Sequence, residues 1–375
     1  MFSGRHHLEQ FIANVQKDTM PTLMMGKVSK SDRRKLSQAI GTQTAGEIYS
    51  DSVDWEHYLK SCPYTQILGD TGGAVIMDWG PRHPAKVILR YNHSKAYHEK
   101  LPISISRTIE RWAKKDFNKF HDDPPAGRVR LEGVVYEPFK HDVLLDISPI
   151  KQLYYAAIHD RLDKRALAPL RRECTENALD FIDQNQSPIL PSHLAVHMAL
   201  VSADNHILFR KRRIERRYGD HWEISLGEFF QGPDAEENDL RETPSSIFRF
   251  LQRAVRDEIG YDKAEAKDFK VYGFAVERPS LAPKLLVVYT VGLKMQDVIW
   301  NARNSLEPAP GYEGIELSPK SLAEAFKNPE LQPLTPLSII AATYALTQHE
   351  HRNSAQLKLV RDLAEQLGAD SNSRV

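Results

Sequence analysis

The sequence predicts an α/β protein of the α+β type, in which a mixed sheet lies between helices and a separate N-terminal α/β domain comes first. Its 375 residues are more than one typical domain needs, so two domains are the simplest arrangement. In the second half, strand-like segments surround one long helical segment, and further helical segments close the chain, as expected of a sheet covered by helices. A polar stretch with two prolines, QNQSPILP at 184–191, separates the halves.

These observations divide the chain into five segments. The first half consists of a polar segment at 1–60 and an α/β domain of unknown role at 61–183. A linker at 184–192 leads to a second domain at 193–347, and a C-terminal helix and tail occupy 348–375.

The predicted elements of the first half are short strands and helices. Apolar runs on either side of a proline and glycine turn indicate strands, and apolar residues three or four positions apart indicate helices. The predicted strands are 74–77, 86–91 and 128–136, and the predicted helices are 108–120, 150–158 and 162–182.

The second half begins with a predicted hairpin, because alternating segments at 193–202 and 206–210 flank a short polar turn. Pro244 and Gly260 mark the two ends of a helix at 244–259. The remaining predicted strands are 271–277 and 284–293, the latter apolar enough to be central, and the closing helices are 322–326, 336–347 and 356–367.

The overall charge and the cysteine content exclude several classes of protein. Fifty basic residues balance fifty acidic ones, so the sequence indicates neither nucleic-acid nor membrane binding. Cys62 and Cys174 are too few for a disulfide scaffold and lack the spacing of a metal site. No apolar run reaches the roughly 18 residues of a membrane span, and no secretory signal opens the chain. We therefore expect a cytoplasmic protein.

The helix at 244–259 carries acidic residues where an apolar face is expected. Glu258 falls near the middle of the apolar arc, and Asp257 lies just off its edge. The apolar residues of that arc are Ile247, Leu251, Ala254, Val255 and Ile259. A buried carboxylate is costly unless it is paired, hydrogen-bonded or bound to a cation. Three explanations follow: the acids hold a divalent metal ion, Glu258 is satisfied by Arg253 or a loop amide, or the apolar stripe ends one turn earlier and the acid is solvated.

The same helix carries part of a known motif. Residues 253–261, RAVRDEIGY, match the second half of the Nudix box, G-x5-E-x7-R-E-U-x-E-E-x-G-U, where U is aliphatic. Residues 222–228, WEISLGE, resemble the strand and glycine that open this box. The chain thus resembles the Nudix hydrolase superfamily over about 193–347, which implies a Nudix-like mixed sheet between helices.

The chain also departs from that motif. Ala254 stands where the family has a glutamate directly after the arginine, and Asp257 replaces the first acid of the final pair. Twenty-five residues separate Gly227 from Arg253, against 13 in the pattern, so 235–244 is predicted to be an insertion. Asp234 is then the expected first acid of the box.

The resemblance implies a metal-dependent site on this helix. The expected cofactor is Mg²⁺ or Mn²⁺, which would neutralise phosphate charge and help activate water. The expected catalytic residues are Glu258, Asp257, Arg253 and Glu228; the expected metal ligands are Glu258, Asp257, Glu228 and Asp234. A further acid could come from a predicted loop at 312–316, which carries Glu313 and Glu316.

The expected substrate-binding residues precede the helix. Alternation places Arg210 and Arg212 on one face of the strand end, where guanidinium groups can clamp a phosphate. His221 and Trp222 could flank a base or ribose, although a tryptophan here is also suited to the core.

Three functions are compatible with these residues. The first is a metal-dependent Nudix-type hydrolase that cleaves a diphosphate linkage in a nucleotide derivative, with an N-terminal domain that shapes substrate choice or forms a homodimer. The second is a catalytically weakened Nudix-fold module that senses a nucleotide-like small molecule and acts through the N-terminal domain or a partner. The third is another enzyme on the same scaffold, such as a metal-using isomerase. Retention of Arg253, Asp257 and Glu258 favours the first, and Ala254 favours the second.

Overall fold

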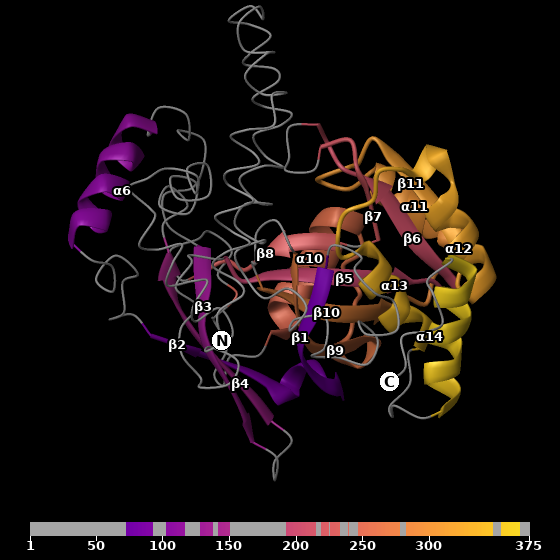
Figure 1. Cartoon of the computed structure of the whole chain (residues 1–375), viewed down its shortest axis with the longest axis horizontal. Coiled ribbons are helices and arrows are strands. Elements are labelled where there is room, and N and C mark those ends of the chain that lie inside the picture. The colour runs from indigo at the N-terminus through magenta and orange to yellow at the C-terminus, as the bar shows by residue number, and fades with distance from the viewer. Residues whose placement is uncertain are drawn as a thin grey trace, which may run out of the picture.

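The structure, a computed structural model of the chain, contains a large mixed sheet, a small sheet and the helices around them (Figure 1). The residues that it describes are 73–92, 103–116, 128–137, 142–150, 193–214, 219–224, 226–232, 239, 247–277, 283–347 and 354–367.

The large sheet has the strand order β1-β9-β10-β5-β6-β11, with β7 paired to β6 and β8 paired to β5. The strands are β1 (Gly73–Arg82), β5 (Ala195–Val201), β6 (His206–Lys211), β7 (Trp222–Glu223), β8 (Leu226–Phe229), β9 (Phe269–Glu277), β10 (Pro283–Thr290) and β11 (Gly311–Glu316). Strands β10 and β5 are parallel, whereas the other pairs are antiparallel. Every residue of β5 is buried, because this strand is covered on both faces. The predicted hairpin and the predicted central strand are confirmed.

Helices cover both faces of the large sheet, so the predicted mixed sheet between helices is confirmed. Helices α10 (Phe248–Ile259) and α11 (Met295–Arg303) contribute to one hydrophobic core. Helices α12 (Pro319–Lys327), α13 (Ser338–Thr347) and α14 (Ser354–Leu367) contribute to the core of the other face. None of the helices that the structure describes combines the length and hydropathy that a transmembrane span requires.

The small sheet has the order β2-β4-β3 and is attached to the large one. Its strands are β2 (Val87–Tyr91), β3 (Arg128–Glu137) and β4 (Asp142–Ile150). The backbone N–H of Leu194 donates to the carbonyl of Val129 at 2.8 Å, and apolar side chains of all three strands join the core that contains α10. Helix α6 (Ile103–Asp116) stands apart from both sheets in Figure 1.

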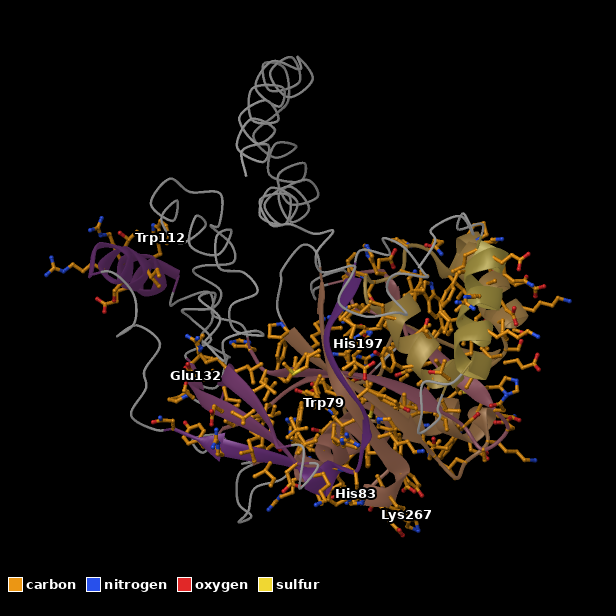
Figure 2. The ribbon with its side chains drawn as sticks, turned by 60° about the horizontal axis from the view of Figure 1, so that its bottom comes forward. Trp79, His83, Trp112, Glu132, His197 and Lys267 are labelled. Carbon is orange, nitrogen blue, oxygen red and sulfur yellow. The ribbon has the colours of Figure 1, made fainter. Side chains whose placement is uncertain are left out.

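Strand β1 shows that the large sheet is not confined to 193–347. It pairs antiparallel with β9, and the indole N–H of Trp79 donates to the carbonyl of Val271 at 3.2 Å. Figure 2 shows Trp79 in the body of the large sheet and Glu132 in the small one. The division into domains at 61–183 and 193–347 stays a prediction, but residues from both ranges share one core.

The structure corrects two predicted elements. Residues 142–150 form strand β4, so Ile150 ends a strand rather than beginning a helix. Residues 311–316 form strand β11 rather than a loop, because they pair with β6. Helix α6 begins at Ile103, five residues before its predicted start, and α10 is described from Phe248. The predicted helix at 162–182 and the linker at 184–192 lie outside the described residues.

The pairing of β1 with β9 can be tested at Gly273. A Cβ atom at this position would lie 1.8 Å from the carbonyl oxygen of Met77, so Gly273→Ala must push the strands apart. We expect it to lower the free energy of unfolding by about 1–3 kcal/mol or more, as overpacking does. Gly292→Ala is the matched control, because nothing lies within 4 Å of its added Cβ. Equal urea midpoints for the two variants would mean that β1 does not pack on β9 in this way.

Candidate functional site

Helix α10 places acidic and basic side chains next to the core. Its apolar residues, among them Leu251 and Val255, are fully buried against the sheet, and Gly260 ends it in the left-handed conformation at φ 69°. Glu258 is 1% exposed, so the prediction that it lies on the buried face is confirmed. The side chain of Asp257 is 15% exposed, at the edge of that face.

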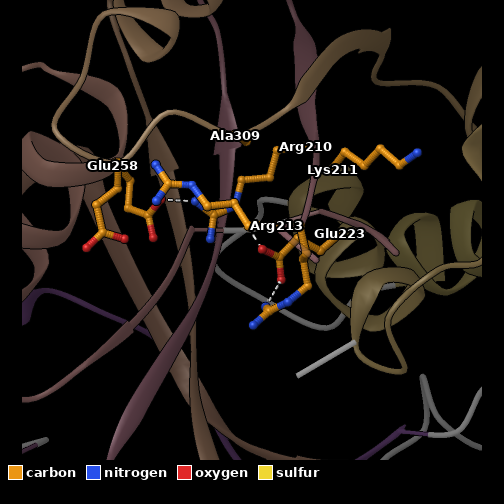
Figure 3. A pocket seen from close by; sticks show the side chains of 8 residues that line it. Arg210, Lys211, Arg213, Glu223, Glu258 and Ala309 are labelled. Carbon is orange, nitrogen blue, oxygen red and sulfur yellow. Dashed lines mark hydrogen bonds and ion pairs between the residues drawn. The ribbon is translucent and has the colours of Figure 1, made fainter. Parts of the chain in front are cut away.

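Glu258 is held by an arginine from the neighbouring strand. Arg210, at the end of β6, donates through Nη1 to Oε2 of Glu258 and through Nε to Oε1 of Glu223 at 2.8 Å (Figure 3). Among the described residues, the other oxygen of Glu258, Oε1, is buried without a hydrogen-bond partner. Of the two explanations for a buried Glu258, pairing within the chain is the observed one, but its partner is Arg210 rather than Arg253.

Glu223 is a member of this site that the sequence did not indicate. It lies on β7, is 1% exposed, and also accepts from Nη1 of Arg212 at 2.5 Å. Burial alone would raise its pKa, but the charges of Arg210 and Arg212 outweigh that effect and lower the pKa to about 2. In the sequence, Glu223 lies between two apolar residues, Trp222 and Ile224. That position could have indicated a buried ion pair, because a charge inside such a strand needs a partner.

A second arginine, Arg253, organises the other acids. It donates to Asp239 through Nε and Nη2, at 3.2 and 3.1 Å, and through Nη2 to the carbonyl of Phe229 at 2.7 Å. Its Nη1 lies 3.6 Å from Oε1 of Glu228 and 3.6 Å from Oδ2 of Asp257. The acid that Arg253 holds most closely is therefore Asp239, inside the predicted insertion.

The carboxylates expected to bind a metal ion are thus divided among three arginines, Arg210, Arg253 and Arg256. Glu258 contacts Arg210, and Glu228 lies 3.6 Å from Arg253. Asp257 accepts a hydrogen bond from Nε of Arg256 at 2.9 Å and lies 3.6 Å from Arg253. Asp234 lies outside the described residues. Within the described parts of the chain, no three His, Cys, Asp or Glu side chains gather as a metal site requires. In this arrangement the acids do not fit a divalent metal ion, since guanidinium groups already neutralise them.

Strand β11 contains the segment from which a further metal-binding acid was expected, but it does not place one at the site. Glu313 and Glu316, on β11, are exposed, and Glu316 accepts a hydrogen bond from the hydroxyl of Ser321 at 3.1 Å. Neither lines the cavity beside Arg210.

A small cavity of about 20 Å³, open to solvent on one side and with room for little more than a water molecule, lies beside the Arg210 ion pair. Four basic side chains, three acidic ones and one alanine line it among the described residues: Arg210, Lys211, Arg212, Arg213, Glu223, Glu258, Glu307 and Ala309. The loop before β11 closes one side, where Nε of the exposed Arg213 donates to the carbonyl of Pro308 at 3.0 Å. The expected clustering of Arg210 and Arg212 is therefore observed, next to Glu258.

The two aromatic residues expected beside a ligand lie elsewhere. Trp222 is 9% exposed and packs in the core on the α13 side of the sheet, which is its alternative role. The Nδ1 atom of the half-buried His221 lies 3.3 Å from the carbonyl of Gly219. Neither residue lines the cavity.

A buried histidine lies close to this charged group. His197 is on β5, opposite Gly227 of β8, and is 2% exposed (Figure 2). Burial, together with the positive charge of Lys284, lowers the pKa of His197 to about 3. The imidazole is therefore neutral at ordinary pH.

The role of Asp239 can be tested by removing its charge. We expect Asp239→Asn to lower the free energy of unfolding by roughly 3 kcal/mol, because Arg253 would remain buried without its closest carboxylate. Glu228→Gln is the matched control, since Glu228 lies farther from Arg253 and should cost less stability than Asp239→Asn. Similar urea midpoints for the two variants would mean that Asp239 is not the main partner.

His197 should make stability depend on pH. Since its pKa is lower in the folded chain than the usual 6.5, the unfolded chain takes up the proton first. The stabilisation is complete above pH about 6.5 and is lost as the pH falls, by up to about 2 kcal/mol at pH 5. His197→Gln removes the titrating group, so urea unfolding between pH 7.5 and 5 should show a flatter pH dependence than wild type. Equal slopes would mean that His197 is not held neutral.

The geometry thus provides a cavity rich in guanidinium groups and a set of acids that two arginines neutralise. Such groups are common in proteins that bind anions, and they do not by themselves identify a family. The Nudix resemblance rests on residues 222–228 and 253–261. The chain matches no protein-family model and no curated protein.

Proposed function

We propose that the cavity beside Glu258 binds a phosphate-bearing, nucleotide-like small molecule, and that the chain acts as a Nudix-like binding or sensing module. The observation that carries this proposal is the direct ion pair of Arg210 with Glu258 in a cavity lined by four basic side chains. Anion recognition needs no metal ion when the protein supplies the positive charge.

The arrangement of the basic side chains supports a phosphate ligand. Arg210 and Arg212 share Glu223 in the depth of the cavity, whereas Arg213 is exposed. Lys211 is one-third exposed and pairs with the exposed Asp220 at 2.7 Å. A phosphate can therefore meet the outer cations first, without breaking the buried ion pairs. The planar guanidinium of Arg213 or Arg212 suits two phosphate oxygens at once.

The acids support binding rather than cleavage. Metal-assisted phosphoryl transfer needs clustered carboxylates that hold a cation against the phosphate. Here Glu258 is neutralised by Arg210, Glu228 faces Arg253, and Asp257 pairs with Arg256. Ala254, one turn before Glu258, is fully buried in the core and offers no ligand.

A metal-dependent hydrolase remains the second candidate, and one observation favours it. Oxygen Oε1 of Glu258 is buried without a hydrogen-bond partner among the described residues, which is costly unless something binds there. A hydrolase acting at this position would have to move Arg210 away from Glu258.

The proposal is tested by titrating the full chain in EDTA with inorganic pyrophosphate, a nucleoside diphosphate and a nucleoside diphosphate sugar. We expect calorimetry to detect binding of at least one of them. Arg212→Met should weaken it roughly tenfold or more, because a charge-assisted hydrogen bond is lost. Arg361→Met is the control, since Arg361 is exposed on α14 and does not line the cavity.

The same compounds incubated with Mg²⁺ or Mn²⁺ distinguish the two candidates. The binding module should release no phosphate product. Product release that is lost in Glu258→Gln would instead establish the hydrolase, and no binding of any compound would refute the proposed module.

A further inference from the structure

The charges around Arg210 are buried to an unusual degree. The side chain of Arg210 is 8% exposed, that of Glu258 is 1% exposed, and that of Glu223 is 2% exposed. One guanidinium thus contacts two carboxylates that come from different elements, α10 and β7.

Each buried carboxylate needs a positive charge beside it. Arg212 pairs with Glu223 and is more exposed than Arg210, at 17%. The α10 face before Glu258 carries Ala254, and Arg253 on the same helix is directed to Asp239, Glu228 and Asp257. Among the described residues, Arg210 is therefore the cation that contacts Glu258.

We infer that the guanidinium of Arg210 is the resident cation of Glu258 and Glu223 and occupies the place that a divalent metal ion would take between these carboxylates. The protein's own positive charge then neutralises the two carboxylates. The wild-type protein gains nothing from a divalent cation there, because metal and guanidinium compete for the same oxygens.

Removing the guanidinium should uncover a cation site. The oxygens made available would be both oxygens of Glu258 and Oε1 of Glu223; Oε1 of Glu258 already lacks a partner among the described residues. Hard carboxylate oxygens are the ligands that Mn²⁺ and Mg²⁺ accept, with water completing the coordination. This inference holds whether or not the cavity binds a phosphate compound, because it concerns only the cation held by the two acids.

The experiment compares full-length Arg210→Met with wild type by titration with MnCl₂ alone, using calorimetry and the thermal midpoint. Methionine keeps the apolar stem and removes the charge. We expect the variant to have a lower midpoint without metal, to bind Mn²⁺ at least about tenfold more tightly than wild type, and to recover stability with it. Adding Glu258→Gln to the variant should abolish the metal response.

Two controls make the result specific. Arg212→Met removes a charge from Glu223 but leaves the Arg210–Glu258 pair, so it should not gain Mn²⁺ affinity. Wild type and Glu258→Gln should show the same weak response to Mn²⁺, a comparison that stands even if Arg210→Met does not fold.

Two results would overturn the inference. One is tight Mn²⁺ binding by wild type that Glu258→Gln removes, because the metal would then displace Arg210. The other is a folded Arg210→Met variant that does not bind Mn²⁺, because the two carboxylates would then not form a cation site. Both are measured without any phosphate compound, so they are distinguishable from a failure of the proposed binding function.

Discussion

The ion pair between Arg210 and Glu258 joins the buried face of α10 to the end of strand β6, and the arrangement of the cavity depends on it. A glutamate that is 1% exposed would be severely destabilising alone, so the helix can pack here only with a cation beside it. Removing one partner of such a pair typically costs about 3–5 kcal/mol, whereas the intact pair contributes little net stability. The pair is therefore better understood as a constraint on where β6, β7 and α10 meet than as a source of stability.

A second arginine, Arg253, lies five residues before Glu258 on the same helix and also neutralises buried acids. Arg253 collects Asp239, the carbonyl of Phe229 and two further acids, and so ties α10 to β8 and to the segment that contains Asp239. Together the two arginines separate acids that a shared metal ion would have to bring together. This separation is the physical reason for proposing that the site binds an anion rather than cleaving it with a metal ion.

Strands from the first half of the chain contact the large sheet and the start of helix α10. The carbonyl of Val87 on β2 accepts from the backbone N–H of Ile247, directly before α10, and β1 extends the large sheet beyond β9. Apolar residues of the small sheet and of α10 belong to one core. The small sheet therefore helps to position the start of the helix that carries Glu258.

Sequence patterns alone determined the hairpin of β5 and β6, the central strand β10, the end of α10 at Gly260 and the burial of Glu258, because periodicity and end signals are local properties of the chain. The alternation of Val143, Leu145 and Ile147 also contained the signal for β4. Only the tertiary structure decided the partners of the acids: Arg210 for Glu258, Asp239 for Arg253, and Glu223 between Arg210 and Arg212. It also decided that β1 joins the large sheet and that residues 311–316 pair with β6. These outcomes depend on which distant segments meet and in what register. The pattern of charges along the sequence does not decide whether a metal ion or a guanidinium group neutralises the acids.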